Sequence, residues 1–313
     1  MSTHIATVFD KNYIVRTLAF YESLQKLGKD YKFWFLCLDN ETKEIMARLD
    51  LPGVILSTLE DLADNELLAT KKDRSIGEFA FTAKSVFINY IANKITDGEA
   101  LIFADNDVIF FLPPDELLEK MRAKNYSIGI TAHRFSKGTE YMNEKVGKYN
   151  AGLLFFIIDQ NSRACIKDWR DDCIDWCYLL YEEERYGDQK YIVKWPKRYE
   201  GVYEIPDKGI NTGSWNLSNW KVTEKENQFF IDEDPLVCYH FHRIKFYIDG
   251  ENLKPLPIHI YHDRLYQIYT KLLENAWVKI CTLNKDWKYG FVEKPNILRL
   301  WKQKLTKLIC TKT

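Results

Sequence analysis

An apolar run that ends in two acids is the feature that most constrains how this chain can fold. Residues 101–104 (LIFA) lead directly into Asp105-Asn106-Asp107, and a second apolar run follows at residues 108–111. A short apolar run that stops at a turn is typical of a strand covered on both faces, as in a parallel α/β sheet. Ligands of such sheets bind at the carboxyl ends of the strands, where unpaired buried carboxylates are costly. A divalent cation would neutralise them and attract a diphosphate, so the run predicts an enzyme that handles a nucleotide-linked substrate.

Strands and helices alternate along the first third of the chain. Strand patterns are expected at residues 5–9, 32–38, 54–57 and 101–104, and helical patterns at 13–27, 41–49 and 78–92. This alternation predicts an α/β fold with a doubly wound, mostly parallel central sheet. Beyond Pro113-Pro114, further strands are expected at 128–132 and 152–158, and further helices at 160–183 and 261–280.

The composition is that of a globular protein with a substantial core. Hydrophobic residues make up 46% of the 313 residues and charged residues 28%, so wholesale disorder is not expected. The net charge of -1 gives no support for a nucleic-acid-binding protein. Aromatic residues reach 15%, and Trp and Tyr suit carbohydrate-binding surfaces as well as cores.

The cysteines and the N-terminus bear on the cellular location. The 7 cysteines are scattered, form no C-x-x-C pair, and are expected to be reduced thiols. Residues 1–4 lead straight into the first strand without a signal-peptide pattern, and no apolar run approaches the ~20 residues of a membrane span. We therefore expect a cytoplasmic protein.

The C-terminal part differs from the rest in charge. We expect one α/β domain over residues 1–260 and a helical, basic extension over residues 261–313. Lysines and arginines outnumber Asp286 and Glu293 between residues 285 and 313, and apolar residues fall near one helical face at Leu298, Trp301, Leu305 and Leu308. A basic amphipathic helix with Trp can lie on the anionic inner face of a membrane. The alternative is a terminal helix that packs its apolar stripe on the domain.

Seven short motifs occur together between residues 3 and 250. They are residues 6–10 (ATVFD) with Tyr13, 78–84 (EFAFTAK), 105–107 (DND), 150–152 (NAG), 187–189 (GDQ), 211–216 (NTGSWN) and 237–245 (VCYHFHRIK). The set resembles the GT-A glycosyltransferases, most of all the retaining enzymes of the glycogenin and bacterial lipopolysaccharide galactosyltransferase type. The resemblance implies a GT-A (Rossmann-like) fold. It also implies metal-dependent transfer of a hexose from a nucleotide diphosphate sugar, UDP above all, to a glycan or lipid-linked acceptor with retention of configuration.

The resemblance assigns several residues to the donor. The first strand end would hold the base, and basic and amide groups would reach the diphosphate and sugar; the residues are Thr7, Asp10, Tyr13, Lys84, Asp105, Asn106, Asn150, Gly152 and Lys245. Other interpretations remain open for three of them. Asp10 also suits a helix N-cap, Lys84 a solvated helix lysine, and Asn150 a turn that begins a strand.

The metal ligands implied by the resemblance are Asp105, Asp107 and His240, with Mn²⁺ or Mg²⁺ as the cofactor. The last motif departs from the family pattern, because Arg243 stands where the family has Gly and Phe246-Tyr247 replaces Pro-Trp. His242 is therefore an alternative ligand, since residues two apart on a strand point to the same side, and Arg243 is an alternative to Lys245 as the diphosphate-binding group. Either histidine is alternatively a core residue hydrogen-bonded to backbone.

Catalysis is assigned by resemblance to Asp188 and Gln189, and the acceptor side to Trp215 and Asn216. Asp188 would grip sugar hydroxyls, and Gln189 would lie near the anomeric carbon. The alternative for Asp188 is a simple N-cap.

Three rival functions are weighed against the glycosyltransferase. A haloacid-dehalogenase-like phosphatase would use Asp105 as nucleophile, but that fold normally begins with this motif. A nucleotidyltransferase would carry a glycine-rich loop after the first strand, and residues 9–13 contain no glycine. A non-catalytic carbohydrate-binding protein would need none of the acid, histidine and lysine set.

Overall fold

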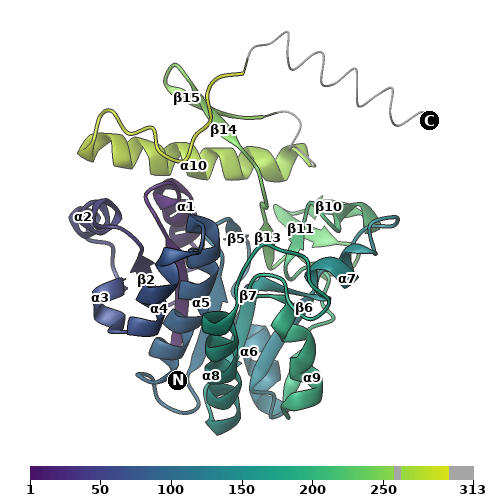
Figure 1. Ribbon diagram of the computed structural model, residues 1–313. Helices are drawn as coiled ribbons and strands as arrows, with labels where there is room; N and C mark the ends of the chain where they lie inside the picture. Colours follow the sequence, from purple (N-terminus) through teal and green to yellow (C-terminus); the bar gives the residue numbers. More distant parts are fainter. Residues whose placement is uncertain (257–261, 296–313) are drawn as a thin grey trace.

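A seven-stranded sheet organises the computed structural model, which describes residues 1–256 and 262–295 (Figure 1). Its order is β3-β2-β1-β4-β7-β6-β8, and β7 runs antiparallel to both of its neighbours. The strands are β1 Thr3–Phe9, β2 Tyr31–Cys37, β3 Val54–Thr58, β4 Ala100–Ala104, β6 Ile128–Ala132, β7 Tyr149–Ile157 and β8 Val202–Glu204. The expected α/β fold with a mostly parallel sheet is confirmed.

Helices cover both faces of this sheet. They are α1 Ile14–Gln25, α2 Asn40–Leu49, α3 Leu59–Leu62, α4 Asn65–Ala69, α5 Ile76–Ala92, α6 Asp115–Ala123, α7 Met142–Val146, α8 Gln160–Asp175, α9 Trp195–Arg198 and α10 Asp263–Leu283. Short 3-10 turns occur at η1 Thr70–Lys72, η2 Lys190–Lys194 and η3 Leu217–Asn219.

Alternate residues of the strands belong to two separate cores. In β4, Ile102 packs in the core shared with α1, α6 and α10, whereas Leu101 and Phe103 pack in the core shared with α5 and α8. Successive side chains of a strand point to opposite faces, so a strand covered on both sides is apolar throughout. This is why residues 101–104 form one continuous apolar run, and why the two acids begin where the covered part of the strand ends.

The helix expected over residues 160–183 is shorter than the sequence pattern indicated. It ends at Asp175, and Trp176 is extended. The guanidinium of Arg74 donates to the carbonyls of Cys173 at 2.7 Å and Ile174 at 2.6 Å, so a side chain distant in sequence satisfies the last turn of the helix. The chain beyond α8 is thereby free to turn back toward the sheet.

A small second sheet lies beside the carboxyl end of the large one. Its order is β5-β13-β9, with β5 Val108–Phe110, β13 Cys238–His240 and β9 Thr212–Gly213. The hairpins of the irregular region are β10 Val222–Lys225 with β11 Gln228–Ile231 and β12 Asp234–Pro235, and β14 Phe246–Asp249 with β15 Asn252–Pro255. The small sheet brings three distant segments together, and the candidate site forms there.

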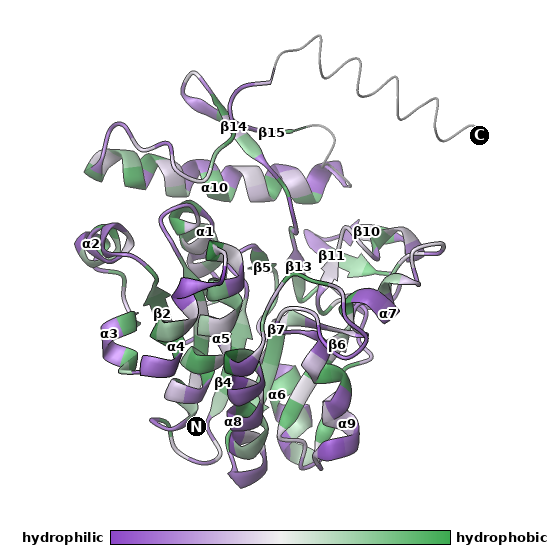
Figure 2. Ribbon diagram, viewed as in Figure 1, coloured by the Kyte–Doolittle hydropathy of each residue, from purple (hydrophilic) through white to green (hydrophobic). Residues whose placement is uncertain are grey.

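The helix α10 packs between α1 and the hairpin β14–β15 (Figure 1). Hydrophobic and hydrophilic residues alternate along it, and Leu265, Tyr269 and Leu273 are buried in the core shared with α1 (Figure 2). The chain then returns over α1, where the guanidinium of Arg16 donates to the carbonyl of Gly290 at 3.3 Å. This part of the predicted extension packs on the domain, whereas Leu298, Trp301, Leu305 and Leu308 lie outside the described residues.

Two further expectations concern membranes and cysteines. Within residues 1–256 and 262–295, no helix combines the length and the apolar character needed to cross a bilayer. The six cysteines in these residues are all free thiols, and five of them are buried.

Candidate active site

The two acids of the apolar run lie next to a histidine from a distant strand. Asp105, Asn106 and Asp107 connect β4 to β5, and β13 pairs antiparallel with β5 so that His240 stands opposite Val108. This register puts Nε2 of His240 2.9 Å from Oδ1 of Asp107 and 4.0 Å from Oδ2 of Asp105. The structure therefore brings together the three residues predicted as metal ligands.

His242 joins the same group. Ligand atoms of Asp107, His240 and His242 all lie within 4.8 Å of one another. Atoms that share one cation are each about 2 Å from it, so a spread of this size suits a single ion. The sequence left a choice between the two histidines, but the geometry makes both of them available.

A chain of hydrogen bonds fixes the orientation of His240. Its Nδ1 donates to Oδ1 of Asn211 at 3.3 Å, and Nδ2 of Asn211 donates to Oδ1 of Asn150 at 3.1 Å. Nδ2 of Asn150 then donates to Nε2 of His133 at 3.2 Å, and Nδ1 of His133 donates to the carbonyl of Gly147 at 3.1 Å. With Nδ1 engaged by Asn211, the relay leaves Nε2 of His240 facing Asp107, to which it donates while the ring is protonated, and a cation could replace that proton. Metal-ligating histidines are commonly held in this way by a partner on the other ring nitrogen.

Asp107, His240 and His242 are called the triad below. Its carboxylate favours positive charge on the groups around it. Burial opposes the charged form of His240, but the carboxylates of Asp107 and Asp105 outweigh it and raise the pKa of His240. Burial likewise opposes the charge on Asp107, yet His240 holds the pKa of Asp107 well below its usual range. Burial and the charge of His240 lower the pKa of His242 to about 4, so this imidazole is neutral and able to act as a ligand at neutral pH.

Lys84 forms a second buried charge cluster beside the first. It projects from α5, which begins with a capping box between Ser75 and Glu78. Its Nζ lies 2.7 Å from Oδ2 of Asp188 and 3.3 Å from Oδ1 of Asp105. Burial disfavours the ammonium, but these two carboxylates raise the pKa of Lys84. The alternative of a solvated helix lysine is wrong, because only 4% of Lys84 is exposed.

The surroundings of Asp105 affect the pKa of its carboxyl group. Burial raises the pKa of Asp105, and the charges of Lys84 and His240 offset this only in part. Asp188 is only 4% exposed, and its side chain caps no helix, since η2 is preceded by Gln189 without a side-chain cap. The N-cap alternative for Asp188 is therefore wrong, and the carboxylate pairs with Lys84.

Gly152 occupies the space between the two clusters. A methyl group at this position would lie 2.6 Å from Cε1 of His240, 2.7 Å from Oδ2 of Asp105 and 2.8 Å from Oδ1 of Asn150. The backbone of Gly152 donates to Oδ1 of Asn150 at 2.9 Å and accepts from the nitrogen of Asp105 at 2.8 Å. Only glycine allows the strand β7 to approach the acids this closely.

The donor-side residues predicted in and just after β1 lie at its carboxyl end, next to the end of β4. Thr7 is fully buried, whereas Tyr13 is 45% exposed. The carboxylate of Asp10 accepts from the backbone of Asn12 at 2.9 Å, and α1 begins only after Tyr13, so Asp10 is not its N-cap. Nδ2 of Asn106 donates to the carbonyl of Val8 at 3.3 Å and thereby ties the acidic loop to β1.

The remaining predicted residues surround the triad at different distances. Trp215 borders it directly, since its ring centroid is 5.1 Å from that of His240. Nε2 of Gln189 donates to the carbonyl of Val146 at 2.8 Å. The side chain of Asn216 is buried and forms hydrogen bonds with backbone groups. Lys245 is exposed and forms no ion pair within the described part of the chain.

Three residues of the site were missed by sequence reasoning. Asn211 and His133 build the relay described above, and Arg16 contributes to the low pKa of Asp107. Arg16 also donates to the carbonyl of Ile244 at 3.2 Å and so ties the segment before Lys245 to α1. The motif at residues 211–216 gave a signal for Asn211, but no sequence pattern singled out Arg16.

Two solved glycosyltransferase structures resemble this chain in fold. The galactosyltransferase LgtC, in complex with donor and acceptor sugar analogs, matches with a TM-score of 0.53 and 14% identity over 87% of this chain and 95% of that one. The glycosyltransferase GlyE of Streptococcus pneumoniae TIGR4 matches with a TM-score of 0.51 and 15% identity over 95% of this chain and 66% of that one. These likenesses show that the chain has the GT-A fold.

Sequence comparison finds relatives among curated proteins, although no family model matches the chain. The uncharacterized protein YfnF of Bacillus subtilis (strain 168) is 25% identical over 246 residues, which are 77% of this chain and 81% of YfnF. The uncharacterized protein YfnD of the same organism is 31% identical over 244 residues, which are 77% of this chain and 78% of YfnD. With the GT-A fold and this degree of identity, the chain belongs to the family of Bacillus subtilis YfnD.

Proposed function

We propose that this protein is a metal-dependent glycosyltransferase that moves a hexose from a nucleotide diphosphate sugar, UDP-linked above all, to a glycan or lipid-linked acceptor. One observation carries the proposal. The cluster of Asp107, His240 and His242 adjoins the buried Lys84–Asp188 pair at the carboxyl end of a GT-A sheet. Such sheet edges are where α/β proteins bind their ligands.

The charges of the two clusters match the charges that develop during sugar transfer. When the bond between sugar and phosphate breaks, negative charge builds on the diphosphate and positive charge on the anomeric carbon. A cation held by Asp107, His240 and His242, with Asp105 beside it, would neutralise the diphosphate. Lys84 is placed to add its charge on the same side, and Asp188 to stabilise the sugar. Two parts of the proposal rest on the family resemblance alone. They are the place of Gln189 next to the sugar and the retention of configuration.

The types of the candidate metal ligands favour manganese over magnesium. Magnesium prefers oxygen ligands, whereas two imidazoles beside carboxylates suit a softer ion. The space that Gly152 leaves open and the orientation of Nε2 of His240 also fit a bound cation. We therefore name Mn²⁺ as the cofactor, with Mg²⁺ as a weaker substitute.

The donor residues divide between direct and indirect roles. The exposed ring of Tyr13 is available to stack on a base. The other residues proposed to bind the nucleotide sugar are Asp10, Asn106, Thr7 and Lys245.

Asn150 has less freedom than the resemblance implied. Its Oδ1 already accepts from Gly152 and Asn211, and its Nδ2 donates once to His133. One N–H remains for the donor sugar. Gly152 acts through the close approach of its backbone.

A phosphatase that uses Asp105 as nucleophile has less support. The carboxylate of Asp105 is paired with Lys84, and the strand that precedes it is the fourth of the chain rather than the first.

The decisive experiment is manganese-dependent hydrolysis of a panel of UDP- and GDP-sugars by wild type, Asp107→Ala and Asp97→Ala. Asp97 is a matched control, because it lies before β4 at the opposite end of the same strand and is paired with Arg163 at the surface. We expect one donor to be hydrolysed by wild type and Asp97→Ala and spared by Asp107→Ala.

Two outcomes would contradict the proposal. Absence of both turnover and nucleotide-sugar binding with every donor would exclude a glycosyltransferase. Binding of glycans without any donor hydrolysis would instead favour a carbohydrate-binding protein.

A further inference from the structure

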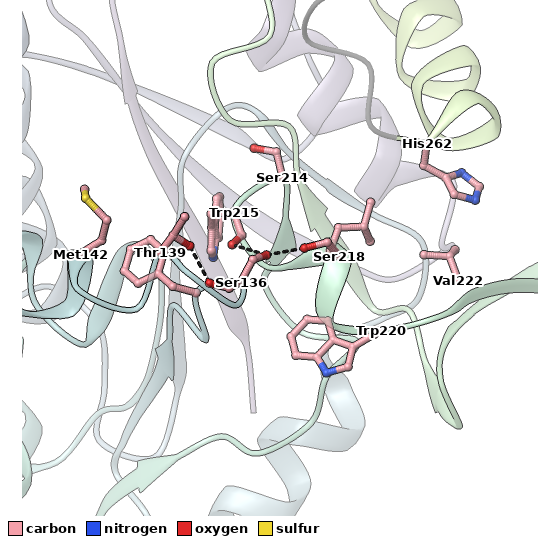
Figure 3. Close-up of a pocket in the computed structure, with 11 residues that line it drawn as sticks. Ser136, Thr139, Met142, Ser214, Trp215, Ser218, Trp220, Val222 and His262 are labelled. Atoms are coloured by element: carbon pink, nitrogen blue, oxygen red, sulfur yellow. Dashed lines mark hydrogen bonds between the residues drawn. The ribbon is translucent and has the colours of Figure 1, made fainter. Parts of the chain in front are cut away.

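A cavity of about 590 Å³ lies beside the triad and is not used by the chemistry described so far (Figure 3). We propose that it is a subsite for a neutral pyranose ring of the acceptor, namely a sugar unit adjacent to the one that receives the transferred hexose. The inference rests on the proposed function and names the acceptor as a glycan. The volume lies within the range of small-molecule sites in proteins.

The position of the cavity connects it to the triad. Trp215 forms one wall, and its ring is perpendicular to the rings of both histidines, with centroids 5.1 Å from His240 and 5.7 Å from His242. A ligand in the cavity is therefore separated from the triad by a single indole. This spacing suits a neighbouring sugar unit rather than the reacting group.

Three aromatic side chains of the cavity are held rigidly from outside it. Phe135 stacks on His133 with centroids 4.6 Å apart, and Arg134 covers one face of Trp220 at 5.2 Å. Nε1 of Trp215 donates to the carbonyl of His133 at 2.8 Å. Rings that are fixed in advance lose little entropy when a flat ligand packs on them, and their faces suit the apolar face of a sugar.

Hydroxyl groups supply the polar part of the cavity. Ser218 donates to Oγ of Ser136 at 2.7 Å, and Ser136 donates to the carbonyl of Trp215 at 3.0 Å. Ser214 lies across from them (Figure 3). Serine oxygens accept more than one hydrogen bond, so these side chains keep acceptors for sugar hydroxyls.

The lining excludes the other substrate of the reaction. It contains no carboxylate, lysine or arginine, and His262 is its one titratable side chain. A diphosphate bound here would lack the cation that its charge requires, so the nucleotide does not belong in this cavity. A neutral ligand with apolar faces and hydroxyl edges fits both the aromatic and the serine side chains.

The test separates binding in the cavity from chemistry at the triad. Binding of p-nitrophenyl glycosides of glucose, galactose and N-acetylglucosamine is measured on the full chain by saturation-transfer NMR. Donor hydrolysis is measured in parallel. The variants are Trp220→Ala, the conservative Trp220→Phe, and Phe230→Ala as a control, since Phe230 is a half-buried aromatic on β11 outside the cavity.

We expect at least one glycoside to bind wild type, and Trp220→Ala to weaken that binding about tenfold. Trp220→Phe and Phe230→Ala should bind nearly as wild type, and all four proteins should hydrolyse the donor equally. Equal binding by wild type and Trp220→Ala, or no binding of any glycoside to wild type, would overturn the subsite. Absence of donor hydrolysis by wild type would instead count against the proposed function, whether or not the glycosides bind.

Discussion

His240 donates a hydrogen bond from Nδ1 to Oδ1 of Asn211, 3.3 Å away, and this bond directs its other nitrogen at Asp107. Asn211 can do this because its backbone is left-handed, with φ of 58°, a conformation that asparagine tolerates better than most residues. A residue that never reaches the acids thus determines which nitrogen faces them.

Asn211→Ala is expected to weaken Mn²⁺ binding by 10- to 100-fold, because His240 loses the group that orients it. Isothermal titration calorimetry with Mn²⁺ alone measures this without any substrate. Asn216→Ala is the matched control, since Asn216 is equally buried but bonds only to backbone groups of Gly213 and His133. Equal Mn²⁺ affinities of the two variants would show that Asn211 does not position the ligand.

Gly152→Ala is expected to reduce Mn²⁺ affinity and to destabilise the fold by about 1–3 kcal/mol, because the added methyl group overlaps His240 and Asp105. Gly77→Ala serves as the contrast, since the same methyl group on α5 meets nothing within 4 Å. That change should leave Mn²⁺ binding intact and stabilise the protein by about 0.5–1 kcal/mol. Urea unfolding and Mn²⁺ titration of both variants decide the matter, and a Gly152→Ala protein with wild-type affinity would contradict the argument.

Lys84→Met is expected to lower the free energy of unfolding by about 3–5 kcal/mol, because it leaves the buried carboxylate of Asp188 and the partly exposed carboxylate of Asp105 without their cation. Adding Asp188→Asn to that variant should recover part of the loss, since one of the uncompensated charges disappears. Lys94→Met changes an exposed lysine just beyond the same helix and should stay within about 0.5 kcal/mol of wild type. Urea unfolding at neutral pH compares these three variants and Asp188→Asn alone with wild type, and additive effects of the two site changes would argue against a direct pair.

His133 is expected to make stability depend on pH on the acid side. Burial lowers the pKa of His133 to about 4, against 6.5 for an ordinary histidine. The unfolded chain therefore binds the proton first, so the contribution is complete above pH 6.5 and is lost as the pH falls toward 4. The full difference corresponds to about 3 kcal/mol. Unfolding curves of wild type and His133→Gln between pH 7.5 and 4 should diverge in slope, and parallel slopes would rule His133 out as the cause.

The sequence indicated the parts of the site that lie on single elements. The apolar run of β4 ends at the acids because the sheet is covered on both faces up to that point, and the helical pattern before it carries Lys84. Both features follow from local periodicity and from where burial stops. The family resemblance extended this to Asp188, Gly152 and His240 by motif alone.

Errors arose where a side chain from elsewhere changed a local preference. The helix expected to reach residue 183 ends at Asp175, where Arg74 bonds its last carbonyls. The N-cap alternatives left open for Asp10 and Asp188 are also excluded, since Asp10 closes a local turn with Asn12 and Asp188 pairs with Lys84. A capping residue and a buried ion-pair partner have the same sequence signature, because both are acids at the start of a turn or helix.

The amino-acid sequence by itself determined the alternation of strands and helices, the sheet edge at which acids collect, and the residue types available for a cation. Only the tertiary structure decided how they combine. The pairing of β13 with β5 brings both histidines to Asp107, and the relay from His240 through Asn211 and Asn150 joins segments separated by 29 and 61 residues. Local periodicity carries no information about such distant partners, because they are selected by the packing of the whole sheet and not by their neighbours in the chain.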